Sequence, residues 1–410
     1  MRILHVIPSV GPVRGGPSQA VLELARAQAR MTGMHTEIVA TNDNGPGLLD
    51  VPIGEVTQYE GAPVRFFPRH SPRLRPLREF AYSGALSAWL GRHMHEYDLI
   101  HVHAFFSHAS TAAMCHARRL HKPYLVRPLG LLCTWSLEQS ALRKSLYLAL
   151  VERKNLDHAA GLEYTSEQEL DEAAPLHLKA PGFVLPFGLH LQAPVHDARP
   201  RLRTEMGLPP DEPVLLFLSR LHPKKGLHHL LEALATRVAR RFTLIVAGSG
   251  PQEYEDQVRA MVHNGPLRDR VKFTGFASGE NKNLLLQGAD AFTLTSHSES
   301  FAIAAMEAMA AGTPVLLTPG VPLATAVARH DTGWVCDLTT DSIARAVDTL
   351  LDGLTDAEAV AARARRCRAL AVNFEWNRIA ASMQEVYKAV LARREIPSMR
   401  IEDLLLQYPE

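Results

Sequence analysis

Short apolar runs recur along this chain, each followed by a turn or by a segment long enough for a helix. In the first half they are the run that begins at Ile3, then HTEIVAT, DLIHVH and PYLVRP. The second half repeats the pattern with PVLLFLSRL, FTLIVAGSG, VKFTGF, AFTLTS and TPVLLT. Alternation of this kind is typical of mostly parallel sheets whose crossover helices cover both faces. It therefore predicts an α/β protein.

The chain is also too long for one hydrophobic core. At 410 residues, two domains of about 200 residues each are expected. The stretch LPFGLHLQAPVHDARPRL, dense in proline and polar residues, separates the two series and indicates a linker. We predict one domain over residues 1–190 and a second over 196–375, both with parallel sheets and with a cleft between them.

The C-terminal part of the chain carries one further helix pattern. Residues 376–395 place Ile379, Met383, Val386 and Val390 at helical spacing, which predicts a helix there. Pro397 is expected to stop that helix. Residues 396–410 are expected to form a tail, of which IEDLLLQYPE, residues 401–410, is short and loosely packed.

Charge and cysteine usage narrow the class of function. The 44 Lys and Arg nearly balance 43 Asp and Glu, so the chain lacks the basic excess of a dedicated nucleic-acid binder. Its four cysteines are far apart and form no CxxC pair, which disfavours a disulfide framework or a zinc site. No apolar stretch approaches about 20 residues, and the first residues do not form a secretory leader. We therefore expect a cytoplasmic protein that does not span a membrane.

The run from Phe301 to Gly312 consists of helix-forming and apolar residues with a single charge, Glu307. Glu299 stands just before it, and we expect the helix to start near Ser300, whose hydroxyl is suited to cap free amides. The amino terminus of such a helix is a candidate anion site. Hydroxyl groups of a sugar would satisfy the carboxylate of Glu307, which is costly to bury without a partner. The alternative is that Glu307 is salt-bridged to a neighbouring helix or exposed.

A second candidate lies in FLSRLHPKKGLHHLLEA. Arg220 follows directly on a buried run, and Lys224, Lys225 and Gly226 lie in the turn before a helix. Ligands of parallel α/β sheets gather at the carboxyl ends of strands. Cations and a close-approach glycine at such an end suit a diphosphate. A lysine pair in a turn is also common as plain solvated surface.

Two features of the first half add to this pattern. In GPVRGGPSQA, Gly15 and Gly16 allow the backbone to approach a phosphate or a sugar, although the GxGxxG spacing of a dinucleotide site is absent. In DLIHVHAFFSHAS, alternation along a strand puts His103 at its carboxyl end, where a histidine can donate a hydrogen bond or carry a proton. His101 and His108 are expected to be ordinary core or surface residues, because the sequence supplies no further zinc ligands.

Together these segments resemble retaining glycosyltransferases of family 4, which have the GT-B fold of two Rossmann-like domains facing across a cleft. The resemblance covers nearly the whole chain. It is carried by ESFAIAAMEAMAAGTPV with its E-x7-E pair, by SRLHPKKG, by GGPSQAVLELA and by DLIHVH.

The resemblance implies roles for these residues. Arg220 and Lys225 would hold the donor diphosphate, while Glu307 would bind the ribose hydroxyls and Glu299 would face the donor sugar. The remaining donor contacts implied are the amides of Ser300, Phe301 and Ala302, the loop at Gly15 and Gly16, and His103 near the reaction centre. The helix that begins near Trp376 would return to the N-terminal domain.

The sequence departs from the family pattern at several positions. Ser300 and Ala302 stand where many members have glycine, Phe187 stands where asparagine is common, and Leu129 stands where histidine is common. These departures leave the diphosphate site intact and bear on the acceptor or on the donor sugar. The chain contains no Asp-x-Asp, which agrees with a mechanism that needs no metal or other cofactor.

The predicted function is transfer of a sugar from a nucleotide diphosphate to an acceptor hydroxyl with retention of configuration. The segment from Gly130 to Glu169 resembles members that build exopolysaccharide or lipopolysaccharide, which implies a saccharide or lipid-linked saccharide acceptor. The arginine-rich stretch 65–78 would then contact the anionic inner membrane surface, or it is a solvated loop. The alternatives are a GT-B nucleotide-sugar 2-epimerase and a non-catalytic nucleotide-sugar binder.

Overall fold

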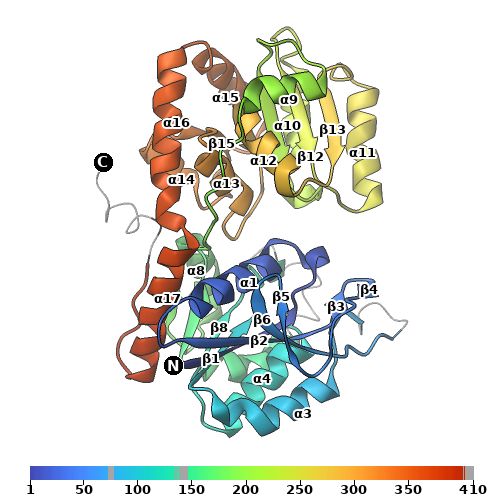
Figure 1. The fold of residues 1–410 in the computed structure, drawn as a ribbon. Helices are drawn as coiled ribbons and strands as arrows, with labels where there is room; N and C mark the ends of the chain where they lie inside the picture. The colour runs from blue at the N-terminus through green and yellow to red at the C-terminus, as the bar shows by residue number, and fades with distance from the viewer. Residues whose placement is uncertain (73–77, 134–135, 138–145, 400, 402–410) are drawn as a thin grey trace. The chain divides into compact units, whose positions relative to one another are not determined.

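The structure is a computed structural model that describes residues 1–72, 78–133, 136–137, 146–399 and 401. The chain divides into two compact units, and each contains one large sheet (Figure 1). The N-terminal unit comprises Met1–Gly188 and the described residues from Trp376 onward, and the C-terminal unit comprises Leu189–Glu375. The expectation of an α/β fold with mostly parallel sheets is confirmed.

The sheet of the N-terminal unit has eight strands. In spatial order they are β10 (Gly182–Val184), β9 (Gly161–Tyr164), β8 (Tyr124–Arg127), β7 (Leu99–His103), β1 (Arg2–Ser9), β2 (His35–Thr41), β6 (Ala62–Phe67) and β5 (Val56–Tyr59). Every neighbouring pair is parallel except β5 with β6. The central strands are buried on both faces, which explains why they read as continuous apolar runs.

Helices cover this sheet on both faces. They are α1 (Gly16–Ala29), α3 (Gly84–His93), α4 (His108–Arg119), α7 (Arg153–Asp157), α8 (Glu167–Ala173) and α17 (Trp376–Leu391). Ser83, Ser107 and Ser166 cap α3, α4 and α8 through their side chains, so short polar residues fix where these helices begin. A two-stranded ribbon, β3 (Asp43–Asn44) with β4 (Gly47–Leu48), follows β2.

The predicted C-terminal helix is α17, and Figure 1 shows it beside α1 in the N-terminal unit. Its apolar residues Ile379, Met383, Val386 and Val390 are buried, as their spacing predicts. Tyr387 is buried on the same helix, although the apolar pattern does not include it. Its hydroxyl therefore needs partners within the unit.

The residues that follow α17 contact the sheet, and the expectation of a loosely packed segment over residues 401–410 is wrong at Ile401, the one residue of that segment that the structure describes. The amide of Met399 donates to the carbonyl of Val184 at 2.8 Å, and the amide of Val184 donates to Ser398 Oγ at 2.9 Å. Ile401 is buried. These bonds occupy the free edge of β10, where unpaired backbone groups favour pairing. Residues 400 and 402–410 lie outside the described part.

The C-terminal unit has a six-stranded, all-parallel sheet. Its spatial order is β13 (Val271–Gly275), β12 (Thr243–Ala247), β11 (Val214–Leu218), β14 (Ala291–Leu294), β15 (Val315–Leu317) and β16 (Gly333–Val335). Its helices are α9 (Ala198–Met206), α10 (Leu227–Ala235), α11 (Gln252–His263), α12 (Gly279–Gly288), α13 (Ile303–Ala311), α14 (Ala324–Arg329), α15 (Thr340–Gly353) and α16 (Ala357–Ala371).

The order of these six strands reverses direction at β11, because β12 lies on one side of it and β14 on the other. In open parallel sheets such a reversal leaves a crevice at the carboxyl ends of the strands, where ligands bind. The loops after β11 and β14 therefore border the expected ligand site.

Candidate functional site

The loop after β11 and the loop after β14 are held in contact by a glycine. Gly226 has φ +68°, and a Cβ atom there would lie 1.8 Å from the carbonyl oxygen of Thr295. Thr295 Oγ1 also donates to the carbonyl of Gly226 at 2.9 Å. No residue with a side chain fits this conformation and this approach. The predicted close-approach glycine is thus required by the neighbouring backbone.

This contact brings together residues that are 74 positions apart. The ammonium of Lys225 donates to both carboxylate oxygens of Glu299, at 2.7 and 2.6 Å. Both side chains are largely buried, so the two opposite charges satisfy each other in the absence of a ligand. The sequence analysis predicted Lys225 from the basic turn after one strand and Glu299 from its position before an apolar helix. In the structure the two side chains contact each other.

Arg220 lies two residues beyond the end of β11 and is exposed. Its loop is fixed by backbone contacts to the loop after β12, since the amide of Leu221 donates to the carbonyl of Ser249 at 3.0 Å. A Cβ atom at Gly250 would lie 1.8 Å from the carbonyl oxygen of Leu221. Residues 247–251, AGSGP, therefore form a turn against which the loop after β11 packs. This contact holds the backbone at Arg220 in place.

The helix after β14 starts later than the sequence indicates. α13 begins at Ile303, and its first flanking residue is Ala302 in the left-handed region at φ 68°. The expected cap at Ser300 is therefore wrong, because the strained turn at Ala302 separates Ser300 and Phe301 from the helix. Phe301 is buried against Phe374, whereas Ser300 and Ala302 are half-buried.

Glu307 lies in the second turn of α13 and forms an ion pair with Lys282 of α12 at 2.6 Å. Its side chain retains 14% of its exposure, so the carboxylate is neither on the open surface nor sealed. The salt-bridged alternative is therefore what the structure shows without a ligand. Glu299 and Glu307 share this property: each carboxylate is held by one lysine.

Gly15 and Gly16 belong to the N-terminal unit, where they open α1. Gly15 has φ 75° and precedes the first helical residue, Gly16. A Cβ atom at Gly15 would meet no other atom within 4 Å, so this glycine is needed for its backbone conformation alone. The part of these residues in donor binding stays a prediction.

His103 is the last residue of β7 and is fully buried. Its Nε2 lies 2.9 Å from His5 Nδ1, and its Nδ1 has no hydrogen-bond partner among the described residues. Burial and the neighbouring His101 hold the pKa of His103 well below its usual range, so the ring is neutral near pH 7. His103 therefore does not carry a second ring proton there, which corrects one of the two roles expected for it.

The backbone that follows His103 is strained. Ala104 and Phe106 have φ of 61° and 58°, in the left-handed region that favours glycine. Each such residue costs about 1–3 kcal/mol and persists only where the surrounding structure imposes it. Strain of this kind is common beside ligand sites.

Two groups of three histidines place ring nitrogens close enough for a metal ion: His5 with His101 and His103, and His228 with His229 and His297. In the first group, the nitrogens of His5 that face its neighbours are already engaged with His103 and Gln28. The sequence missed both groups, because His5 and His297 are distant from their partners along the chain.

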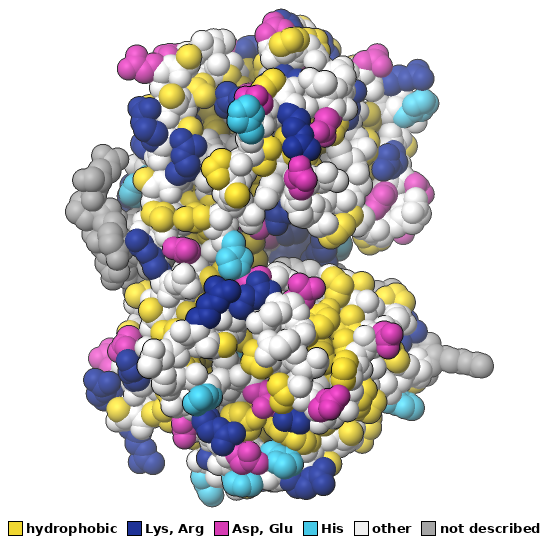
Figure 2. Space-filling view, viewed as in Figure 1, with side chains coloured by type: hydrophobic (Ala, Val, Ile, Leu, Met, Phe, Trp, Pro, Cys, Tyr) yellow, Lys and Arg dark blue, Asp and Glu magenta, His cyan; other side chains and the backbone are white. Residues whose placement is uncertain are grey.

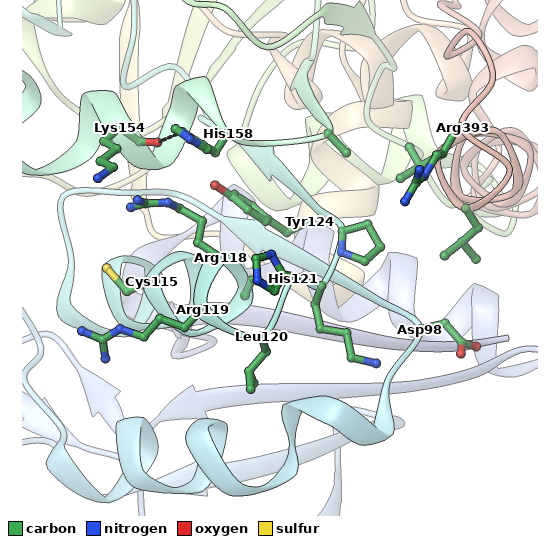
Figure 3. Close-up of a pocket in the computed structure, with 16 residues that line it drawn as sticks. Asp98, Cys115, Arg118, Arg119, Leu120, His121, Tyr124, Lys154, His158 and Arg393 are labelled. Carbon is green, nitrogen blue, oxygen red and sulfur yellow. Dashed lines mark hydrogen bonds between the residues drawn. The ribbon is translucent and has the colours of Figure 1, made fainter.

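A large cavity among the described residues, of about 1250 Å³, lies elsewhere (Figure 3). It is formed where α4 ends and β8 begins, and its lining includes Arg118, Arg119, Lys154 and Arg393. This is the amino end of β8, whereas ligands of parallel sheets bind at carboxyl ends. We therefore place the candidate site at the β11 and β14 loops.

The arginine-rich stretch 65–78 is partly committed to internal contacts. Arg65 donates to Glu37 at 2.7 Å and stacks on Trp89, and the buried Arg69 pairs with Asp43. These two arginines are not free to face a membrane. Residues 73–77, with Arg73 and Arg75, lie outside the described part.

No single-signed patch stands out on the face drawn in Figure 2, where basic and acidic side chains are interspersed. Within the part of the chain that the structure describes, no helix has both the length and the apolar character needed to cross a bilayer.

Comparisons with known proteins extend this picture. The family model described as Glycosyl transferase 4-like domain matches residues 15–188, and that described as Glycosyl transferases group 1 matches residues 198–366. D-inositol 3-phosphate glycosyltransferase 2 of Catenulispora acidiphila is 30% identical over 423 positions, which cover 97% of this chain and 93% of the relative. An uncharacterized glycosyltransferase of Methanocaldococcus jannaschii is 32% identical over 191 residues, and that match spans 46% of this chain and 48% of the relative.

The solved structure of Anabaena HepE in complex with UDP and glucose has the same fold, with a TM-score of 0.73 and 21% identity over 95% of this chain and 100% of that chain. The two family models match the two units in turn, and the Catenulispora relative is similar over nearly its full length. The chain therefore belongs to the glycosyltransferases of the GT-B fold, with a 4-like domain followed by a group 1 domain.

Proposed function

We propose that the protein is a retaining family 4 glycosyltransferase that moves a sugar from a nucleotide diphosphate to an acceptor hydroxyl without a metal ion. The C-terminal unit binds the donor and the N-terminal unit binds the acceptor. This proposal agrees with the absence of an Asp-x-Asp motif, since arginine and lysine then stabilise the leaving diphosphate.

The observation that carries the proposal is the pairing of Lys225 with Glu299 at the carboxyl edge of the C-terminal sheet. A donor that brings phosphate oxygens to Lys225 and hydroxyls to Glu299 replaces this ion pair with two charge-assisted contacts. The exposed guanidinium of Arg220 supplies a second cation in the neighbouring loop.

Glu307 is assigned to the ribose hydroxyls, and Ser300, Phe301 and Ala302 are assigned to the sugar and phosphate through their amides. Before donor binding, the charge of Glu307 is held by Lys282. Departure of that lysine leaves a carboxylate that can accept from two adjacent hydroxyls, a geometry that suits a ribose.

For the pathway, we propose exopolysaccharide or lipopolysaccharide synthesis at the cytoplasmic face of the inner membrane. The acceptor is then a saccharide or a lipid-linked saccharide. The segment from Gly130 to Glu169 supports this assignment by its resemblance to such enzymes, and among known relatives HepE was solved with UDP and glucose.

A donor screen tests the proposal. Melting temperatures of the full chain are measured with UDP- and GDP-sugars, because a ligand that binds only the native state raises the melting point. The stabilising donor is then incubated with saccharide acceptors in EDTA, and proton NMR reports the anomeric configuration of the product. Retention of configuration in EDTA is expected.

Other outcomes identify the alternatives. A 2-epimerase consumes the donor with no acceptor present, and a non-catalytic binder is stabilised by the donor but does not consume it. Inversion of configuration, or full loss of turnover in EDTA that Mg²⁺ restores, contradicts the proposed mechanism.

A further inference from the structure

A row of polar side chains crosses one face of the N-terminal sheet, beneath α1 and α17. We call it the buried polar row. His5 pairs in register with His101, and His103 with Arg127, so these side chains point to the same face. The members of the row are His5 of β1, His101 and His103 of β7, Arg127 of β8, Glu163 of β9, Gln28 of α1 and Tyr387 of α17, all of them buried.

Glu163 lies at one end of this row. Arg127 Nε lies 3.1 Å from one carboxylate oxygen, and His101 Nε2 lies 2.8 Å from the other, although neither N–H is aligned for a straight hydrogen bond. A carboxylate only accepts, so the hydrogen of this contact is on His101 Nε2.

Tyr387 links His101 to α1. Its hydroxyl lies 2.8 Å from His101 Nδ1. The hydroxyl oxygen then accepts from Gln28 Nε2 at 3.3 Å. Gln28 is thereby oriented with its carbonyl oxygen toward His5 Nε2, 2.8 Å away. His5 Nε2 carries the hydrogen of that contact.

The last two steps lead to His103. Burial lowers the pKa of His5 to about 3, so its ring holds one hydrogen near neutral pH, and that hydrogen is on Nε2. His5 Nδ1 is therefore an acceptor, and His103 Nε2 donates to it at 2.9 Å. His103 is neutral as well, which leaves its Nδ1 as a bare lone pair with no partner among the described residues.

We infer that Tyr387, Gln28 and His5 are positioning residues that fix His103 as the Nε2–H tautomer and present its Nδ1 as a hydrogen-bond acceptor. The bonds from His103 through His5 and Gln28 to Tyr387 all point away from His103. The C-terminal helix thus determines the hydrogen-bonding character of a residue at the end of β7, through Tyr387.

This tautomer selects the chemistry of the group that meets His103. A lone pair attracts a hydroxyl and repels a phosphate oxygen, which is also an acceptor. His103 is therefore suited to a sugar hydroxyl and not to the diphosphate. This assignment rests on the proposed function only for the identity of the hydroxyl, because the tautomer is set by the protein.

The tautomer can be observed directly. The full chain is labelled with ¹⁵N-histidine, and two-bond ¹H–¹⁵N correlation spectra distinguish Nδ1–H from Nε2–H rings. Signals are assigned with His5→Gln and His103→Gln. The expected result is a neutral Nε2–H ring for His5 and His103 at pH 7. A His103 ring with its hydrogen on Nδ1, or a protonated ring, overturns the inference.

Tyr387→Phe tests the relay, because it removes the acceptor for Gln28 Nε2 while retaining the ring. His5 and His103 are expected to become mixtures of both tautomers. Tyr124→Phe is the matched control, since the Tyr124 hydroxyl is also buried and donates to the carbonyl of Asn155. Tyr124 of β8 pairs in register with Ile100 of β7, which precedes His101. The side chain of Tyr124 therefore lies on the opposite face of the sheet from the histidines. The control is expected to leave all three rings unchanged.

If Tyr387→Phe does not fold, Gln28→Leu is used instead, because it removes the acceptor for His5 Nε2. An unchanged His103 tautomer in whichever of these variants folds shows that the row does not direct it. Turnover of the stabilising donor is measured in parallel. A loss of about tenfold in kcat, the factor that one hydrogen bond provides, is expected for Tyr387→Phe and not for Tyr124→Phe.

A chain that transfers no sugar refutes the proposed function while the spectra still decide the tautomer. If the tautomers mix as expected but turnover in Tyr387→Phe equals that of Tyr124→Phe, the row is structural and its positioning role is refuted.

Discussion

The two units handle buried charge in different ways. In the C-terminal unit, Glu299 and Glu307 are each paired with one lysine, and these side chains keep between 8 and 27% of their exposure. In the N-terminal unit, Glu163 is sealed with Arg127 and His101 at one end of the buried polar row. A ligand can replace the lysines of the first set, whereas nothing from solvent reaches the second. The first set is suited to binding and the second to preorganisation.

The largest change in stability should follow removal of the buried carboxylate of Glu163. Glu163→Ala leaves Arg127 and His101 buried without an anion, and we expect it to lower the free energy of unfolding by about 3–5 kcal/mol. Urea denaturation measures this. The control, Glu37→Ala, removes a partly exposed partner of Arg65 and should cost about 1 kcal/mol or less. Equal losses in both variants contradict the comparison.

Glu307→Ala should act on binding and not on folding. Loss of charge-assisted hydrogen bonds to the ribose is expected to weaken donor affinity by about a hundredfold, measured by calorimetry. Glu280→Ala, which removes an exposed partner of Arg201 in the same unit, should leave affinity unchanged. Unchanged affinity in Glu307→Ala refutes its assignment to the ribose.

The buried polar row also predicts a dependence of stability on pH. Burial lowers the pKa of His5 from 6.5 to about 3. Above pH 6.5 the folded and unfolded states are both neutral at this ring. As the pH falls toward 3, the unfolded chain binds a proton that the folded protein does not, so stability is lost.

Between pH 7 and pH 5 this loss amounts to about 2 kcal/mol from His5 alone. His5→Gln should therefore lose less stability than the unmodified chain over this interval, as measured by urea titrations at both pH values. His35→Gln, at an exposed position in the same unit, should retain the original slope. If the unmodified chain and both variants lose the same stability between pH 7 and pH 5, the His5 ring binds protons equally in the folded and unfolded states.

Lys225→Ala should lower turnover by more than tenfold, because the leaving diphosphate loses one cation. A tenfold loss corresponds to a rise of about 1.4 kcal/mol in the activation free energy. Its effect on unfolding should be smaller than that of Glu163→Ala. Lys224→Ala is the matched control in the same turn and should keep more than half of the activity. Turnover near normal in Lys225→Ala removes the diphosphate contact from the proposal.

Much of the fold was predictable because it depends on local composition. Five of the strands of the C-terminal sheet match apolar runs, but β16, which is partly exposed and includes Trp334, gives no such run. Helix α13 was predictable from its alanines and methionines, but its start was not. The left-handed Ala302 that delays the helix reflects packing of the preceding loop, which composition does not encode.

Hydrophobic periodicity and turn chemistry act over a few neighbouring positions, so the two α/β units, their alternating elements and the residue types at strand ends could be predicted from the sequence. Which charges meet depends on tertiary contacts. Lys225 reaches Glu299 because Gly226 lets two loops touch, and His5 reaches His103 because adjacent parallel strands share a face. The buried polar row draws its side chains from six separate elements, so no local pattern could have specified the direction of its hydrogen bonds.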